Sequence, residues 1–199
     1  MKRIKKIMLW TIIIIAGIWT LLTLFVEIAG PKKKSLFGNE NNVLKAIIVY
    51  DPDPFYNLDQ QVCESFAKAL AAKGWFVQVL SVKAAKEIKV VQCNLYVCCA
   101  NTYNWAPDWA ITGFIKKNIN FKNQNVVAIT LGGGSTERSQ KIFENLIKEQ
   151  GANLLASKTW WLWRPNDKTR LKESNTKVAV EMAAKFGEEM ADKCSAINK

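Results

Sequence analysis

The chain has 199 residues, of which 49% are apolar and 23% charged, and its formal net charge is +11 at pH 7. This length and composition suit one compact domain with an appendage, and they exclude a disordered tail and a collagen-like fibre. The sequence contains no histidine, which excludes Ser-His-Asp and Cys-His catalysis, HExxH zinc sites and His-ligated haem. It therefore nominates neither a catalytic residue nor a metal ligand.

The positive charge is concentrated near the amino terminus. Residues 1–45 contain eight Lys or Arg and two Glu, a net charge of +6, which leaves +5 for the other 154 residues. Basic residues that flank an apolar segment are typical of membrane proteins. We therefore expect a membrane and not a nucleic acid as the partner of this region.

A continuous apolar segment separates the two basic flanks. Ile7–Val26 contains 20 residues without a charge, and a helix of this length spans about 30 Å, the thickness of a bilayer core. The alternatives are a buried core helix and a cleaved signal peptide, whose apolar region is shorter, at about 7 to 15 residues. We predict a transmembrane anchor at 1–30, a juxtamembrane linker at 31–42 and a folded domain at 43–199.

The orientation of this segment in the membrane is only weakly biased. Four basic residues and the amino terminus precede it, and three lysines follow it. This slightly favours a single-pass protein of the cell membrane with its amino terminus inside and its domain outside the cytoplasm. The five cysteines, which include the adjacent Cys98 and Cys99, suit buried thiols better than disulfides and argue mildly for the opposite orientation.

Short apolar runs alternate with helical patterns along the rest of the chain. Expected strands cover 44–50, 75–82, 94–100, 125–131 and 153–164, and expected helices cover 63–74, 107–118, 135–150 and 176–194. This alternation predicts an α/β fold with a five-stranded, doubly wound parallel sheet. Ligands bind such sheets at the carboxyl ends of the strands, where the loops are 51–59, 101–109, 132–138 and 164–174.

Several segments of this region resemble the flavodoxin family. Ala46–Pro52 and Val62–Gly74 are similar to its first strand and helix, Leu95–Pro107 to the strand and loop that touch the flavin ring, and Val126–Gly134 to the fourth strand and its glycine turn. The resemblance covers about residues 43–193. It implies a flavodoxin-like sheet with strand order 2-1-3-4-5, FMN as cofactor, and a role in electron transfer or in reduction of a small acceptor.

The resemblance assigns candidate FMN-binding residues to three loops. Tyr103 and Trp105 are expected against the flavin ring, with the backbone of 56–58 and 132–135 around it. The whole set is Tyr56, Asn57, Leu58, Asn101, Thr102, Tyr103, Asn104, Trp105, Gly132, Gly133, Gly134 and Ser135. A tight strand-to-helix turn is a second explanation of the three glycines.

The loop expected at the FMN phosphate departs from the family pattern. Flavodoxins carry a Ser/Thr- and Gly-rich turn there, whose hydroxyl and N–H groups hold the phosphate at a helix N-terminus. In this chain Asp51–Asp59 contains no glycine, two prolines that lack an N–H, and three carboxylates that repel a dianion. We therefore expect weak FMN binding, and the alternative is a cofactor-free flavodoxin-like interaction module at the membrane.

Aromatic side chains gather in two loops at one expected edge of the sheet: Phe55, Tyr56, Tyr103, Trp105 and Trp109. They suit stacking on a flat ring, packing onto the domain, or contact with the membrane surface, and the sequence leaves these roles open. Core or edge packing is expected for three aromatic residues of the last strand: Trp160, Trp161 and Trp163. Under either functional alternative, we also expect an unidentified redox or protein partner.

Overall fold

The computed structural model describes residues 2–87 and 93–197. Its sheet contains five parallel strands in the order β3-β2-β4-β6-β7. Their bounds are β2 (Lys45–Tyr50), β3 (Phe76–Ser81), β4 (Leu95–Tyr103), β6 (Asn125–Gly132) and β7 (Asn153–Trp161). In chain order of the parallel strands this is 2-1-3-4-5, so the predicted α/β, doubly wound, flavodoxin-like class is confirmed.

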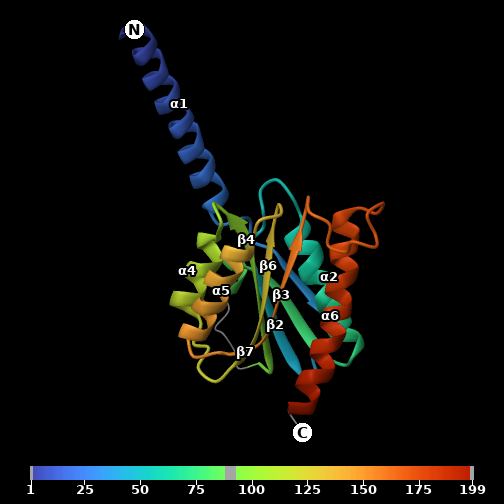
Figure 1. The fold of residues 1–199 in the computed structure, drawn as a ribbon. Helices are drawn as coiled ribbons and strands as arrows, with labels where there is room; N and C mark the ends of the chain where they lie inside the picture. The colour runs from blue at the N-terminus through green and yellow to red at the C-terminus, as the bar shows by residue number, and fades with distance from the viewer. Residues whose placement is uncertain (1, 88–92, 198–199) are drawn as a thin grey trace.

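Helices cover both faces of the sheet, as Figure 1 shows. One face carries α2 (Leu58–Ala72) and α6 (Asn175–Ile197), and the other carries α4 (Trp109–Asn118) and α5 (Glu137–Glu149). The short α3 (Val82–Ala85) follows β3. Winding reverses between β2 and β4, which places the switch point of the sheet, and with it the expected ligand site, at the carboxyl ends of these two strands.

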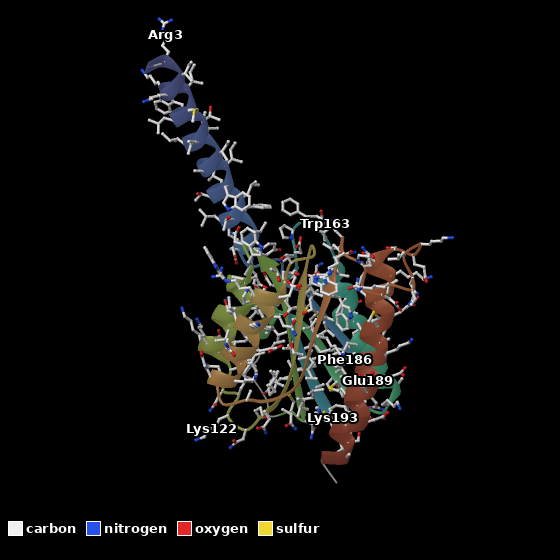
Figure 2. The ribbon with its side chains drawn as sticks, in the orientation of Figure 1. Arg3, Lys122, Trp163, Phe186, Glu189 and Lys193 are labelled. Atoms are coloured by element: carbon white, nitrogen blue, oxygen red, sulfur yellow. The ribbon has the colours of Figure 1, made fainter. Side chains whose placement is uncertain are left out.

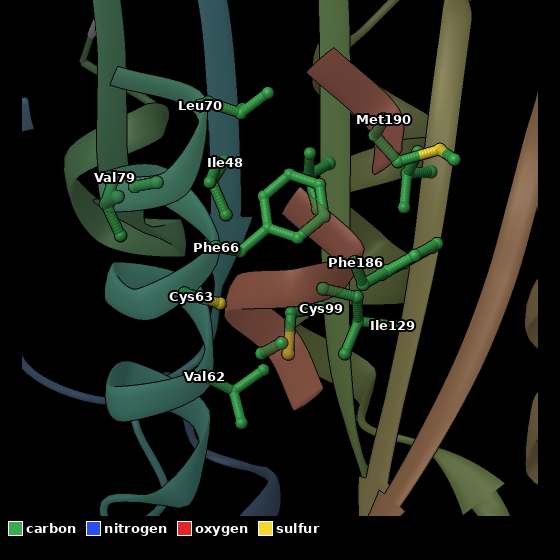
Figure 3. Packing of buried hydrophobic residues seen from close by; sticks show 14 of the residues in the cluster. Ile48, Val62, Cys63, Phe66, Leu70, Val79, Cys99, Ile129, Phe186 and Met190 are labelled. Atoms are coloured by element: carbon green, nitrogen blue, oxygen red, sulfur yellow. The ribbon is translucent and has the colours of Figure 1, made fainter. Parts of the chain in front are cut away.

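Strand residues divide alternately between two buried clusters, because successive side chains of a strand point to opposite faces. Ile48 and Cys99 pack with α2 and α6, while Ile47 and Cys98 pack with α4 and α5. Figure 3 shows the first cluster, where Phe66 of α2 points towards α6. Four of the five cysteines are buried in these layers, in agreement with the sequence interpretation.

Two short strands extend the predicted sheet. β1 (Lys34–Phe37) pairs antiparallel with β3, and β5 (Ala106–Pro107) pairs antiparallel with β4. Part of the segment 31–42, which the sequence predicts as a juxtamembrane linker, therefore joins the sheet as β1. Residues 34–37 carry too few apolar side chains to give a strand pattern, and they pair through their backbone. Gly38 permits the chain to turn directly after β1. Its φ is 81°, and a Cβ there would lie 2.0 Å from the Trp75 carbonyl oxygen.

The amino-terminal segment forms one helix, α1 (Lys2–Glu27), which extends away from the sheet at the end towards which β6 and β7 point (Figure 1). Its residues 3–27 are long and apolar enough to cross a membrane, and the most apolar part is not buried by the domain. The helix is directly bonded to the domain. The amide of Gly30 donates to Asp51 at 2.9 Å, and that of Trp109 donates to Glu27 at 2.5 Å.

Candidate functional site

A cavity of about 200 Å³ lies where the loops after β2, β4, β6 and β7 meet. Its lining combines the ends of strands and the start of α2 with aromatic and polar side chains. Seven of the residues expected from the sequence line it: Tyr56, Leu58, Asn101, Thr102, Tyr103, Gly132 and Gly133. The structure thus brings residues from three separate predicted loops to one place.

A second cavity of about 220 Å³ adjoins the first, with Thr102 and Gly133 common to both linings. Four more of the expected residues line it: Asn104, Trp105, Gly134 and Ser135. Trp19 of α1 completes its wall. Of the expected set, Asn57 lines neither of these two cavities. It lies at the start of α2, where its side chain accepts a hydrogen bond from Gln61.

The carboxylate of Asp53 accepts hydrogen bonds within the turn between β2 and α2. One oxygen accepts the amides of Phe55 and Tyr56 at 2.7 and 2.9 Å, and the other accepts the hydroxyl of Tyr103 at 2.7 Å. The Asp53 amide in turn donates to Asp59 at 2.6 Å. Three backbone amides of this turn, those of Asp53, Phe55 and Tyr56, therefore donate to carboxylates of the chain itself.

A buried polar network fixes the floor of the site. The side-chain amide of Asn101, at the end of β4, donates to the Asp51 carbonyl at 2.9 Å and to the Asp59 carboxylate at 3.3 Å. The Asp108 carboxylate accepts hydrogen bonds from the amides of Asn101 and Ile111. These bonds cap the start of α4 and connect the two ends of the segment between Asn101 and α4. The side chain of Asn101 thus fixes the position of the loop after β2 relative to the end of β4.

Burial raises the pKa of the acids in this network. The pKa of Asp51 and of Asp59 rises to about 6, chiefly because burial disfavours the charged form, although backbone amides that donate to them act the other way. Burial also raises the pKa of Asp108 well above its usual value, with a further increase from the nearby Asp51. The Tyr103 hydroxyl has a raised pKa because it is buried and bonded to Asp53.

The tight hairpin between β4 and β5 carries Trp105, the second aromatic residue that the sequence predicts against a flavin ring. Asn104 and Trp105 connect β4 to β5, and their φ angles are 49° and 59°. Two consecutive positive φ angles are typical of a type I′ turn, in which Asn and Gly are favoured and a bulky tryptophan is not. The turn therefore exposes the Trp105 side chain at a conformational cost of about 1 kcal/mol.

Several lining residues were missed as contributors to the site. Trp163 was expected in core or edge packing, but it lies on the rim, where it contacts Gly133 and lines the cavity with Leu162 (Figure 2). Trp160, by contrast, is buried in the core as expected. The signal for Trp163 in the sequence is its position directly before the loop 164–174, which is one of the loops expected at the carboxyl ends of the strands. Leu131, Asp53 and Asp59 complete the lining.

Comparison with known proteins identifies the fold. No protein-family model matches the sequence, and no curated protein is significantly similar to it. Among solved structures, an archaeal flavodoxin matches with a TM-score of 0.57 and 17% identity over 76% of this chain and 99% of its own. Flavodoxin 1 of Bacillus cereus matches with a TM-score of 0.56 and 13% identity, over 74% and 97%.

A larger enzyme contains the same fold as one part. Rubredoxin oxygen:oxidoreductase of Desulfovibrio gigas matches with a TM-score of 0.61 and 16% identity over 76% of this chain, but over only 36% of its own chain. This chain therefore spans about a third of that enzyme. At these identities the comparisons define the flavodoxin-like fold.

The site fits a flavin ring better than it fits the FMN phosphate. Tyr56, Tyr103 and Trp163 line this cavity, and aromatic side chains suit stacking or edge contacts with a ring. In the turn that would hold the phosphate, four amides between residues 53 and 60 already donate to Asp53 or Asp59. A dianion would compete with these carboxylates for donors and meet their charge, so this loop does not fit a phosphate.

Proposed function

We propose that this protein is a membrane-anchored flavodoxin-like domain that binds a flavin weakly, through its ring, and carries electrons or reduces a small acceptor at the membrane. The observation that supports it is the cavity at the switch point, where strand ends converge with Tyr56, Tyr103 and Trp163. A bound flavin would supply the redox chemistry. The protein's own groups would hold the ring and keep phosphate out of the Asp53 turn.

The site makes a specific prediction about which flavin is preferred. A cavity of about 200 Å³ is smaller than most ligand sites, which are about 300 to 1,000 Å³, so part of the ligand must remain outside it. Because the phosphate is not held, FMN gains little over riboflavin, the same flavin without a phosphate. We infer weak binding of both, with riboflavin at least as tight as FMN.

A cofactor-free interaction module is the second candidate, and the Asp53 turn is the observation that favours it. A loop in which the amides of Asp53, Phe55 and Tyr56 already donate to its own carboxylates has no need of an anionic ligand at these donors. In that case the exposed aromatic residues at the same edge would serve a protein or membrane partner.

Flavin titration of the full chain in detergent separates the two candidates. The quenching of flavin fluorescence would be measured with riboflavin and with FMN up to millimolar concentration. Saturable binding with riboflavin at least as tight as FMN supports the flavin site. The absence of saturation with either compound would exclude it and leave the interaction module.

Membrane anchoring predicts resistance to washing. Burial of a helix such as α1 in lipid does not depend on the charge of its flanking lysines, so the protein should remain in the membrane pellet after high salt and after alkaline carbonate. Detergent alone should release it. Recovery of the protein in the salt wash, or a mature chain that lacks α1, would contradict the anchor.

We propose that the amino terminus lies inside and the domain outside the cytoplasm, as the charge before α1 favours. The test is a cysteine introduced at exposed Lys122, at the end of the domain far from α1. An impermeant maleimide should label Lys122→Cys on intact cells above the level of the unsubstituted protein. Protection on intact cells with labelling after lysis would reverse the orientation.

A further inference from the structure

We propose that the carboxyl end of the sheet is inserted into the interface of the bilayer that α1 crosses, so that the site opens among lipid headgroups. The surface concerned, here called the aromatic rim, consists of Phe55, Tyr56, Trp105, Trp109 and Trp163. This inference rests on the membrane anchoring proposed above, and it goes beyond it, because an anchor by itself leaves the domain free in water.

The aromatic rim is the part of the described domain where large aromatic side chains are left open. The exposed fraction is 61% for Phe55, 56% for Trp105, 55% for Trp109 and 73% for Trp163. Phe55, Trp105 and Trp163 come from three loops at the carboxyl end of the sheet, and Trp109 begins α4 at the same end. Tryptophan and tyrosine are the residues enriched at membrane–water interfaces, where an apolar ring and a polar edge are both satisfied.

Contacts with α1 place the rim at the depth of the interface. The Asn104 side chain donates to Thr23 at 3.1 Å, and the rings of Phe55 and Phe25 lie 5.8 Å apart. Thr23 is four residues before Glu27, or about 6 Å along the helix axis. Loops in contact with this level of a transmembrane helix are at the depth of about 5 to 10 Å that interfacial elements reach.

The connection between α1 and the domain is too short to hold the rim away from lipid. The apolar segment ends at Val26, and the next residue, Glu27, is already bonded to the first amide of α4. Gly30 is bonded to Asp51 at the end of β2. Figure 1 shows that the strand ends lie at the end of the domain from which α1 extends, so with both bonds made they would face the membrane that α1 crosses.

The conformation of the hairpin that carries Trp105 independently supports a contact between this hairpin and the membrane surface. Its positive φ is a conformation that glycine adopts at lower cost, and the side chain is more than half exposed. Exposed Lys168 and Lys172 lie on the loop after β7, at the same end of the sheet, together with exposed Leu171. Lysines beside apolar residues suit a headgroup layer, where their charge meets lipid phosphate.

Lipid, rather than another protein, is the occupant that these contacts support. The rim is continuous with the helix that is itself expected in the bilayer, and it shares the ring contact of Phe25 with Phe55. Exposed aromatic residues near lysines fit the headgroup layer of a bilayer.

The test uses the full chain in phosphatidylcholine vesicles, with an environment-sensitive NBD label on one introduced cysteine. Trp163→Cys and Phe55→Cys place the label on the rim, and Lys122→Cys places it at the opposite end of the domain, as Figure 2 shows for Trp163 and Lys122. We expect blue-shifted emission on the rim and quenching by lipid-borne nitroxide that is about twofold or more stronger than at position 122. Aqueous iodide should show the reverse order.

Each other result overturns the inference in a recognisable way. If the protein floats with the vesicles but rim labels respond to iodide as the label at 122 does, the anchor stands and the insertion is wrong. If the rim labels are shielded in native membranes but not in pure lipid vesicles, the occupant is a protein. If the chain does not associate with vesicles, the proposed anchor itself fails, whatever the flavin titration shows.

Discussion

Replacement of Asp53 by serine should tighten FMN binding by about fivefold or more and leave riboflavin binding within about twofold. The substitution frees the amides of Phe55 and Tyr56 and removes a charge that would lie beside the phosphate. Repulsion between two charges at 4 Å is about 1 kcal/mol in water and about 4 kcal/mol near a protein surface. The measurement is the ratio of the two dissociation constants, from fluorescence titrations of the full chain.

The matched control for this substitution is Asp192→Ser. It makes the same change in net charge on α6, far from the site, where Asp192 is paired with Lys73. The control should leave both affinities unchanged. An Asp53→Ser protein that is folded but binds FMN no better than before would mean that a bound flavin does not direct its phosphate to this turn.

The domain should become more stable as the pH falls from 7 to 5. Asp51 and Asp59 have a pKa of about 6 in the folded state and 3.8 as the ordinary value. Between these values the folded state binds more protons than the unfolded state, so stability is gained below pH 6 and lost as the pH rises through it. The gain is about 1 kcal/mol per group, and the melting temperature should rise by about 4 °C or more.

Surface acids do not mask this effect, because their shifts act in another window. The pKa of Glu173 is lowered to about 2 by Arg170 and Lys177, so its contribution is lost only below about pH 4.5. The measurement is thermal unfolding followed by near-ultraviolet circular dichroism, at constant ionic strength. Asp59→Asn should weaken the dependence of the melting temperature on pH. A melting temperature that falls from pH 7 to pH 5 would contradict the burial of these acids as carboxyl groups.

The sequence was a good guide to the fold because its strands are apolar on both faces and regularly separated by amphipathic helices. Ile47–Val49 and Val126–Ile129 could only be central strands of a covered sheet. β1 escaped prediction because an edge strand needs little apolar surface and is held by backbone hydrogen bonds to β3. Its partner cannot be read from Lys34–Phe37 alone, since pairing is a property of the folded sheet.

The site was harder to predict, because its decisive features are contacts between loops. The sequence shows that Asp51–Asp59 is acidic, but not that Asp53 takes two amides and the Tyr103 hydroxyl as partners. It places Trp163 near a strand end, but not on the rim of the cavity. The contact of Thr23 with Asn104 joins residues 81 positions apart, and no local pattern announces it.

The most direct test of the proposed flavin site is a riboflavin titration of three proteins: the natural chain, Tyr103→Ala and Trp109→Ala. Tyr103 lines the cavity, whereas Trp109 is an exposed aromatic residue at the same edge that lies outside its lining. Loss of the Tyr103 ring should weaken binding by about fivefold, which corresponds to an aromatic contact of about 1 kcal/mol. Trp109→Ala should bind as the natural chain does. Equal losses in the two variants, or no saturable binding by the natural chain, would contradict the account.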